Sequence, residues 1–184
     1  MSKNSKYRSV TPETDIVYPD VMGLLEEEEK KIIQDTWENV KSDATSYGND
    51  LFTRLFNENP KYLEKFASLR IIPRNKLSGH PRLIAHGTQV IYTITAVIDE
   101  IGFPGIVTEL LFKVARSHFK RQVSRQMFEN LCNIMIGLMI ERLGDKVMNK
   151  KAIDAWKKFF NSMIDVMIAC YKNCEKDQML MIEF

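Results

Sequence analysis

Apolar residues recur every three or four positions over most of this chain, and that spacing constrains the fold more than any other feature. Between Pro81 and Ile101 the apolar side chains advance as they would on one face of an α-helix. Similar helical patterns occupy residues 24–40, 47–59, 110–118, 124–143 and 150–173. No segment shows the bounded two-residue alternation that a half-buried strand requires. The sequence therefore predicts an all-α fold built by pairwise packing of helices.

The helical patterns are interrupted at both ends of the chain and at one internal corner. Residues 1–22 contain prolines and no hydrophobic periodicity, so we expect a flexible N-terminal arm. The stretch from residue 60 to residue 80 has little regular pattern and should form short turns. We expect one domain over residues 23–175 and a C-terminal tail over residues 176–184.

Composition excludes several classes of protein. Lysine and arginine number 26 against 24 aspartates and glutamates, and no five-residue window is wholly basic, so we expect no nucleic-acid partner. Charges interrupt the longest apolar runs, so we expect no membrane span, no secretory signal and a cytoplasmic location. The three cysteines lack CxxC spacing and suit reduced thiols packed in helices.

Two histidines lie on apolar helical stripes. His86 is in line with Leu83 and Val90, and His118 follows Val114 by one turn. A single histidine on such a stripe is usually a core residue that hydrogen-bonds to backbone. Two inward histidines on different helices also suit a planar metal cofactor held between them. A structural zinc site would need about four close ligands, and this chain has only one further histidine.

Three segments resemble globins. The second and third globin helices and the following corner are matched by YGNDLFTRLFNENPKYLEKFASL, with Gly48 at a close helix crossing and Phe66 at the haem-stacking phenylalanine. The distal helix is matched by HPRLIAHGTQV and the proximal helix by VARSHFKRQVS. The resemblance spans about residues 24–174 and is strongest to insect intracellular globins, with features of neuroglobins and cytoglobins.

This resemblance implies a globin fold around a pocket for haem b. His118 would be the proximal iron ligand, and His86 would lie on the distal side, where it either donates a hydrogen bond to O₂ or binds iron as a sixth ligand. The residues implied around the haem are Phe52, Phe66, His86, Val90, Val114, His118, Val123, Phe128 and Leu131.

The function implied by the resemblance is reversible binding of O₂, and of CO and NO, for oxygen storage or transport inside cells. One alternative is an enzyme that uses the same iron for nitric oxide dioxygenation, nitrite reduction or redox scavenging, with an external reductase as electron donor. Another is a haem-free helical domain for protein interactions, in which both histidines are ordinary core residues. We expect a monomer or a weak homodimer.

Overall fold

The computed structural model describes residues 23–182, without the side chains of residues 173 and 175–182. Its elements are α1 (Glu27–Ser42), α2 (Ala44–Glu58), η1 (Pro60–Lys65), η2 (Arg74–Lys76), α3 (Pro81–Asp99), α4 (Pro104–Phe119), α5 (Arg125–Val147) and α6 (Lys150–Ile182). No strand occurs within this range, so the predicted all-α fold is confirmed. The arm expected over residues 1–22 lies outside the described residues.

Most helix ends follow signals that are readable in the sequence. Helix α1 begins three residues later than the apolar pattern, because the Glu29 carboxylate accepts the backbone N–H of Glu26 at 2.8 Å and caps the first turn. Helix α5 is interrupted at Gly144, whose φ of 75° is left-handed, so its regular part ends where the pattern predicted. The corner between α2 and α3 contains only the short helices η1 and η2, as predicted.

The predicted end of the last helix was wrong. Helix α6 continues past residue 173 to Ile182, into the stretch expected to be a C-terminal tail. Neither proline nor glycine occurs after Lys150, and the final residues include good helix formers, so nothing local stops the helix. The helix therefore continues beyond the residue at which the apolar pattern predicted its end.

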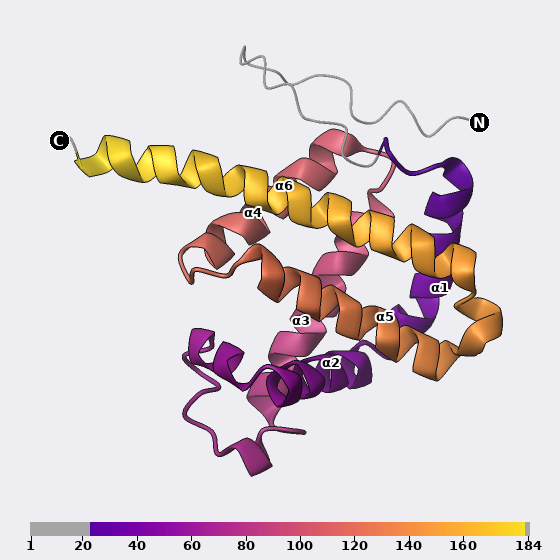
Figure 1. Ribbon diagram of the computed structural model, residues 1–184, viewed down its shortest axis with the longest axis horizontal. Coiled ribbons are helices and arrows are strands. Elements are labelled where there is room, and N and C mark those ends of the chain that lie inside the picture. Colours follow the sequence, from indigo (N-terminus) through magenta and orange to yellow (C-terminus); the bar gives the residue numbers. More distant parts are fainter. Residues whose placement is uncertain (1–22, 183–184) are drawn as a thin grey trace.

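The helices pack in pairs around one core. Helix α6 crosses one face of the molecule beside α5, and α3 passes behind both (Figure 1). At the centre the rings of Trp37 and Trp156 lie 5.4 Å apart. Each indole N–H donates to a buried threonine hydroxyl, Trp37 to Thr95 at 2.8 Å and Trp156 to Thr36 at 2.9 Å. This core fastens α1 to both α3 and α6.

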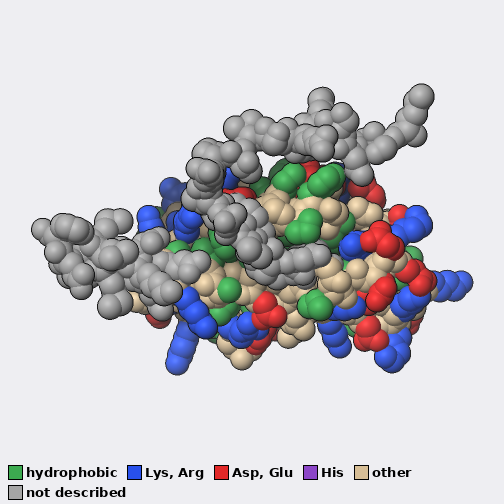
Figure 2. All heavy atoms as spheres, turned by 90° about the horizontal axis from the view of Figure 1, so that it is seen from above, with side chains coloured by type: hydrophobic (Ala, Val, Ile, Leu, Met, Phe, Trp, Pro, Cys, Tyr) green, Lys and Arg blue, Asp and Glu red, His purple; other side chains and the backbone are tan. Residues whose placement is uncertain are grey.

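Acidic and basic side chains are intermingled over much of the coloured surface in Figure 2. Several ion pairs join neighbouring helices, including Arg54 with Glu141 at 2.7 Å and Lys158 with Glu29 at 2.7 Å. Among the described helices, none has the length and apolar character needed to span a membrane.

Candidate functional site

The distal part of the candidate site depends on a very close crossing of α2 and α3. A Cβ atom at Gly48 would lie 2.3 Å from the carbonyl carbon of Gly87, and a Cβ at Gly87 would lie 2.3 Å from the Gly48 oxygen. Only glycine allows two backbones to approach this closely. The crossing that the resemblance predicted at Gly48 is confirmed, while its partner Gly87 was missed although it directly follows His86.

Three of the predicted residues meet beside this crossing. The His86 ring lies 4.7 Å from the Phe52 ring and 5.2 Å from the Phe66 ring, and it meets both edge to face. These side chains come from α3, α2 and the residue that follows η1. Phe56, one turn after Phe52, lies 5.0 Å from Phe66 and holds it in place. Sequence reasoning missed Phe56 as a contributor, although its helical spacing from Phe52 was a usable signal.

His118 lies near the end of α4 with one ring nitrogen fixed. Its Nδ1 is 2.8 Å from the Val114 carbonyl oxygen and 3.2 Å from the Ser117 hydroxyl. A carbonyl can only accept, so Nδ1 carries the proton and Nε2 keeps its lone pair. The Phe128 ring packs against the imidazole at 5.3 Å. The side chain is thereby oriented as a metal-binding histidine usually is, by a hydrogen bond on its other nitrogen.

The corner after His118 is fastened to α6. The Val123 backbone N–H donates to the His118 carbonyl at 3.2 Å, and the Val123 carbonyl accepts the Tyr171 hydroxyl at 2.9 Å. Tyr171 also packs edge to face on Phe119 at 5.3 Å. Tyr171 was missed because this contact joins residues 48 positions apart, which no local pattern reveals.

Both imidazoles are kept neutral by their surroundings. Burial, with smaller contributions from the charges of His118 and Arg121, lowers the pKa of His86 to about 4. Burial also lowers the pKa of His118, with a smaller contribution from Arg121, against the opposing effect of the Val114 carbonyl. Neutral imidazole is the form that binds metals.

The remaining predicted residues form an apolar surround that the protein leaves partly exposed. Phe52 and Phe128 are buried. The half-buried members, all packed against the core, are Phe66, Val90, Val114, Val123 and Leu131. The role of these side chains around a cofactor stays a prediction.

The donor set fits haem better than a bare metal ion. Within residues 23–182, no group of three or more histidine, cysteine, aspartate or glutamate side chains could hold such an ion. Two neutral imidazoles in an apolar surround suit a metal that brings its own equatorial ligands, as iron in a porphyrin does. The third histidine, His80, caps the start of α3, where its Nδ1 accepts the Arg82 N–H at 3.1 Å.

Comparison with known proteins agrees with this geometry. The family described as Globin matches residues 49–167, well over half of the chain. A globin of Nerita albicilla is 27% identical over 153 residues, which cover 82% of this chain and 95% of that protein. Neuroglobin of Danio rerio is 24% identical over 79% of this chain and 92% of its own length.

A solved structure is also similar. The haemoglobin of the botfly Gasterophilus intestinalis superposes with a TM-score of 0.73 at 25% identity, and the match covers 80% of this chain and 99% of that one. The all-helical packing, the glycine crossing and the family match agree with one another. The chain therefore belongs to the globin family.

Proposed function

We propose that this globin binds haem b between α3 and α4, with Nε2 of His118 as the protein's permanent ligand to iron. The observation that supports this proposal most directly is the fixed tautomer of His118. Its Nδ1 lies 2.8 Å from the Val114 carbonyl oxygen, and burial lowers the pKa of the imidazole. Haem iron held by a histidine binds diatomic gases such as O₂, CO and NO. The residues proposed to surround it are Phe52, Phe66, His86, Val90, Val114, Val123, Phe128 and Leu131.

His86 is the proposed distal residue. Because it is neutral, one ring nitrogen carries a proton that a polar diatomic ligand can accept, and the other carries a lone pair that can bind iron. The edges of Phe52 and Phe66 limit how its ring can turn. We propose that His86 binds iron in the resting state, so that an external ligand must first displace it.

The cellular role we propose is reversible O₂ binding for storage or transport in the cytoplasm. The functional domain would be residues 23–175, and the protein would be a monomer or a weak homodimer. Relatives named globin, neuroglobin and myoglobin support gas binding, including the myoglobin of Makaira nigricans at 26% identity over 74% of this chain.

The proximal ligand is tested by His118→Ala. We expect haem to be lost on gel filtration, because the substitution removes the protein–iron bond and leaves a cavity where the imidazole stood. Added free imidazole should fill that cavity and restore haem retention. His80→Ala is the matched control and should keep wild-type haem content, since His80 only caps α3. Equal haem retention in both variants would rule out His118 as the ligand.

The resting state is tested with His86→Leu. A six-coordinate wild-type ferrous spectrum should become five-coordinate in the variant, and CO association should become faster because no internal ligand has to leave. Loss of the imidazole N–H should also speed O₂ release. If the wild-type ferrous spectrum is already five-coordinate and the variant binds CO no faster, His86 is only a hydrogen-bond donor.

A further inference from the structure

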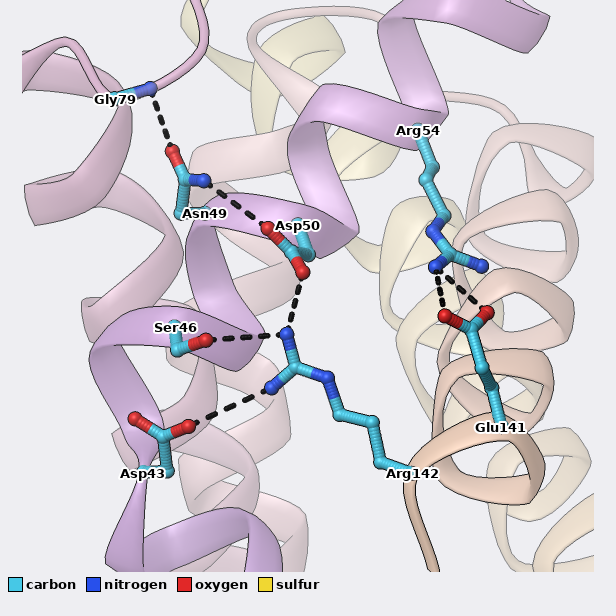
Figure 3. A network of polar contacts seen from close by, with 8 residues as sticks. All are labelled: Asp43, Ser46, Asn49, Asp50, Arg54, Gly79, Glu141 and Arg142. Carbon is cyan, nitrogen blue, oxygen red and sulfur yellow. Dashed lines mark hydrogen bonds and ion pairs between the residues drawn. The ribbon is translucent and has the colours of Figure 1, made fainter. Parts of the chain in front are cut away.

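A chain of polar contacts runs from α5 across α2 to the turn that precedes α3 (Figure 3). Arg142 on α5 donates to Asp50 and, at 3.1 Å, to the Ser46 hydroxyl. The Asp50 carboxylate accepts the Asn49 side-chain amide at 3.1 Å, and Asn49 Oδ1 accepts the backbone N–H of Gly79 at 2.9 Å. This series of contacts thus ends at the backbone of Gly79, just before the His80 cap of α3.

Arg142 anchors the α5 end of this series of contacts. Its side chain is 23% exposed, pairs with Asp43 at 3.6 Å as well as with Asp50, and lies over the Tyr47 ring at 4.2 Å. Charge-assisted hydrogen bonds of this kind are stronger than neutral ones. Asp50 is therefore fixed, and through it the amide of Asn49 is turned so that its oxygen faces Gly79.

Neighbouring residues of α2 hold the first two turns of α3 at both ends. Asn49 holds Gly79 at the start, and Gly48 contacts Gly87 where the second turn ends. His86 lies between these two anchors, next to the second one. A helix segment fixed at both ends cannot shift as a unit without losing one of the contacts. Gly79 adopts a φ of +76°, which suits the tight turn at the first anchor.

We infer that Asn49 is a positioning residue for His86. Its hydrogen bond to Gly79, oriented by Asp50 and Arg142, restrains the first two turns of α3 and so sets how readily the imidazole moves relative to the iron site. This inference rests on the proposed haem-binding function for its consequence. The restraint on α3 itself is a property of the chain and can be measured with or without haem.

Hydrogen exchange of the full-length protein without haem tests the restraint. In Asn49→Ala, amides of residues 82–87 should exchange about three- to tenfold faster, as expected for loss of one hydrogen bond that limits local opening. Amides of residues 91–98 serve as an internal reference and should not change. The measured quantity is the exchange ratio, that is, the mean exchange rate of residues 82–87 divided by that of residues 91–98. Arg142→Met should raise this ratio by a smaller factor than Asn49→Ala, because it releases Asp50 but leaves the Asn49 amide in place.

Glu141→Gln is the matched control. It weakens the Arg54–Glu141 pair, which also joins α2 to α5 in Figure 3 but does not reach Gly79. The exchange ratio should therefore stay at the wild-type value. A wild-type ratio in Asn49→Ala, or an equal rise in Glu141→Gln, would overturn the inference.

The haem-loaded protein supplies the second measurement. In Asn49→Ala, release of His86, measured as the limiting rate of CO binding at high CO concentration, should rise by a similar factor while haem content stays constant. Failure to bind haem at all would overturn the proposed function and leave the exchange result standing. Faster exchange with an unchanged limiting rate would show that the restraint exists but does not control His86.

Discussion

Helix α3 has two contact regions that are completed in different ways. Against α2, the backbones of Gly48 and Gly87 are in direct contact. Around the candidate site, the His86 ring makes no hydrogen bond within the described residues, and Val90 on α3 and Val114 on α4 stay half-buried. In the first region, called the closed region below, Gly48 and Gly87 of the protein itself fill the contact. In the second region, apolar side chains remain partly exposed and, in the described part of the chain, the His86 ring nitrogens remain without a hydrogen-bond partner.

The difference shows where a ligand can contribute to folding energy. Apolar surface removed from water stabilises by about 25 cal/mol per Å², so a flat apolar cofactor that covers the half-exposed side chains would add stability where the protein itself does not. The closed region can gain nothing in this way. Its function is to keep α3 in place whether or not the second region is filled.

The largest effect should come from breaking the closed region. Gly48→Ala puts a methyl group 2.3 Å from the Gly87 carbonyl carbon, and the clash is with backbone that cannot rotate away. We expect a loss of about 3 kcal/mol or more in the free energy of unfolding, measured by urea denaturation. Gly137→Ala, in α5 with no atom within 4 Å of the new methyl, should be neutral or stabilise by up to about 1 kcal/mol. Similar stabilities for the two variants would show that the crossing tolerates a side chain.

A smaller effect should come from the corner that follows α4, beside the second region. Tyr171→Phe removes the hydroxyl that donates to the Val123 carbonyl, and should cost about 1 kcal/mol in unfolding free energy. Haem should also dissociate faster, because the corner that follows His118 loses its attachment to α6. Tyr92→Phe provides the comparison, since the Tyr92 side chain is largely exposed and should tolerate the change. Equal haem dissociation rates in both variants would argue against a role for the attachment.

The smallest effect concerns the pH dependence of stability at the ion pair between α1 and α6, outside both regions. The Lys158 ammonium lowers the pKa of Glu29, helped by the Glu26 backbone N–H, below its ordinary value of 4.5. The folded state therefore holds this carboxylate ionised more strongly than the unfolded state does. Its contribution, below about 1 kcal/mol for so accessible a pair, is present above pH 4.5 and is lost as the pH falls through the lowered pKa.

Glu29→Gln should remove that part of the acid sensitivity, seen as a flatter decline of unfolding free energy between pH 5 and pH 3. Lys158→Met should flatten the curve in the same way, because it removes the main cause of the shift. An unchanged slope in both variants would assign the acid sensitivity to other groups.

Local pattern was sufficient for most of the helices and for the inward placement of the two histidines. The spacing of Leu83, His86 and Val90 predicted α3 and the side of it that carries the imidazole. Those inferences succeed because a helix repeats every 3.6 residues, so the neighbours of a side chain on its own helix can be read from the sequence. The end of α6 could not be read in this way, because the sequence there contains no proline or glycine that would stop the helix.

Long-range contacts had to come from the tertiary structure. The sequence by itself determined an all-α chain, the identity of its two inward histidines and, through resemblance, the residues expected near a haem. Only the folded chain decided that Gly87 meets Gly48, that Tyr171 holds the corner after His118, and that Asn49 reaches Gly79. Each of these contacts joins segments far apart in sequence, and its geometry depends on the angle at which two helices cross, which the packing of the whole core sets.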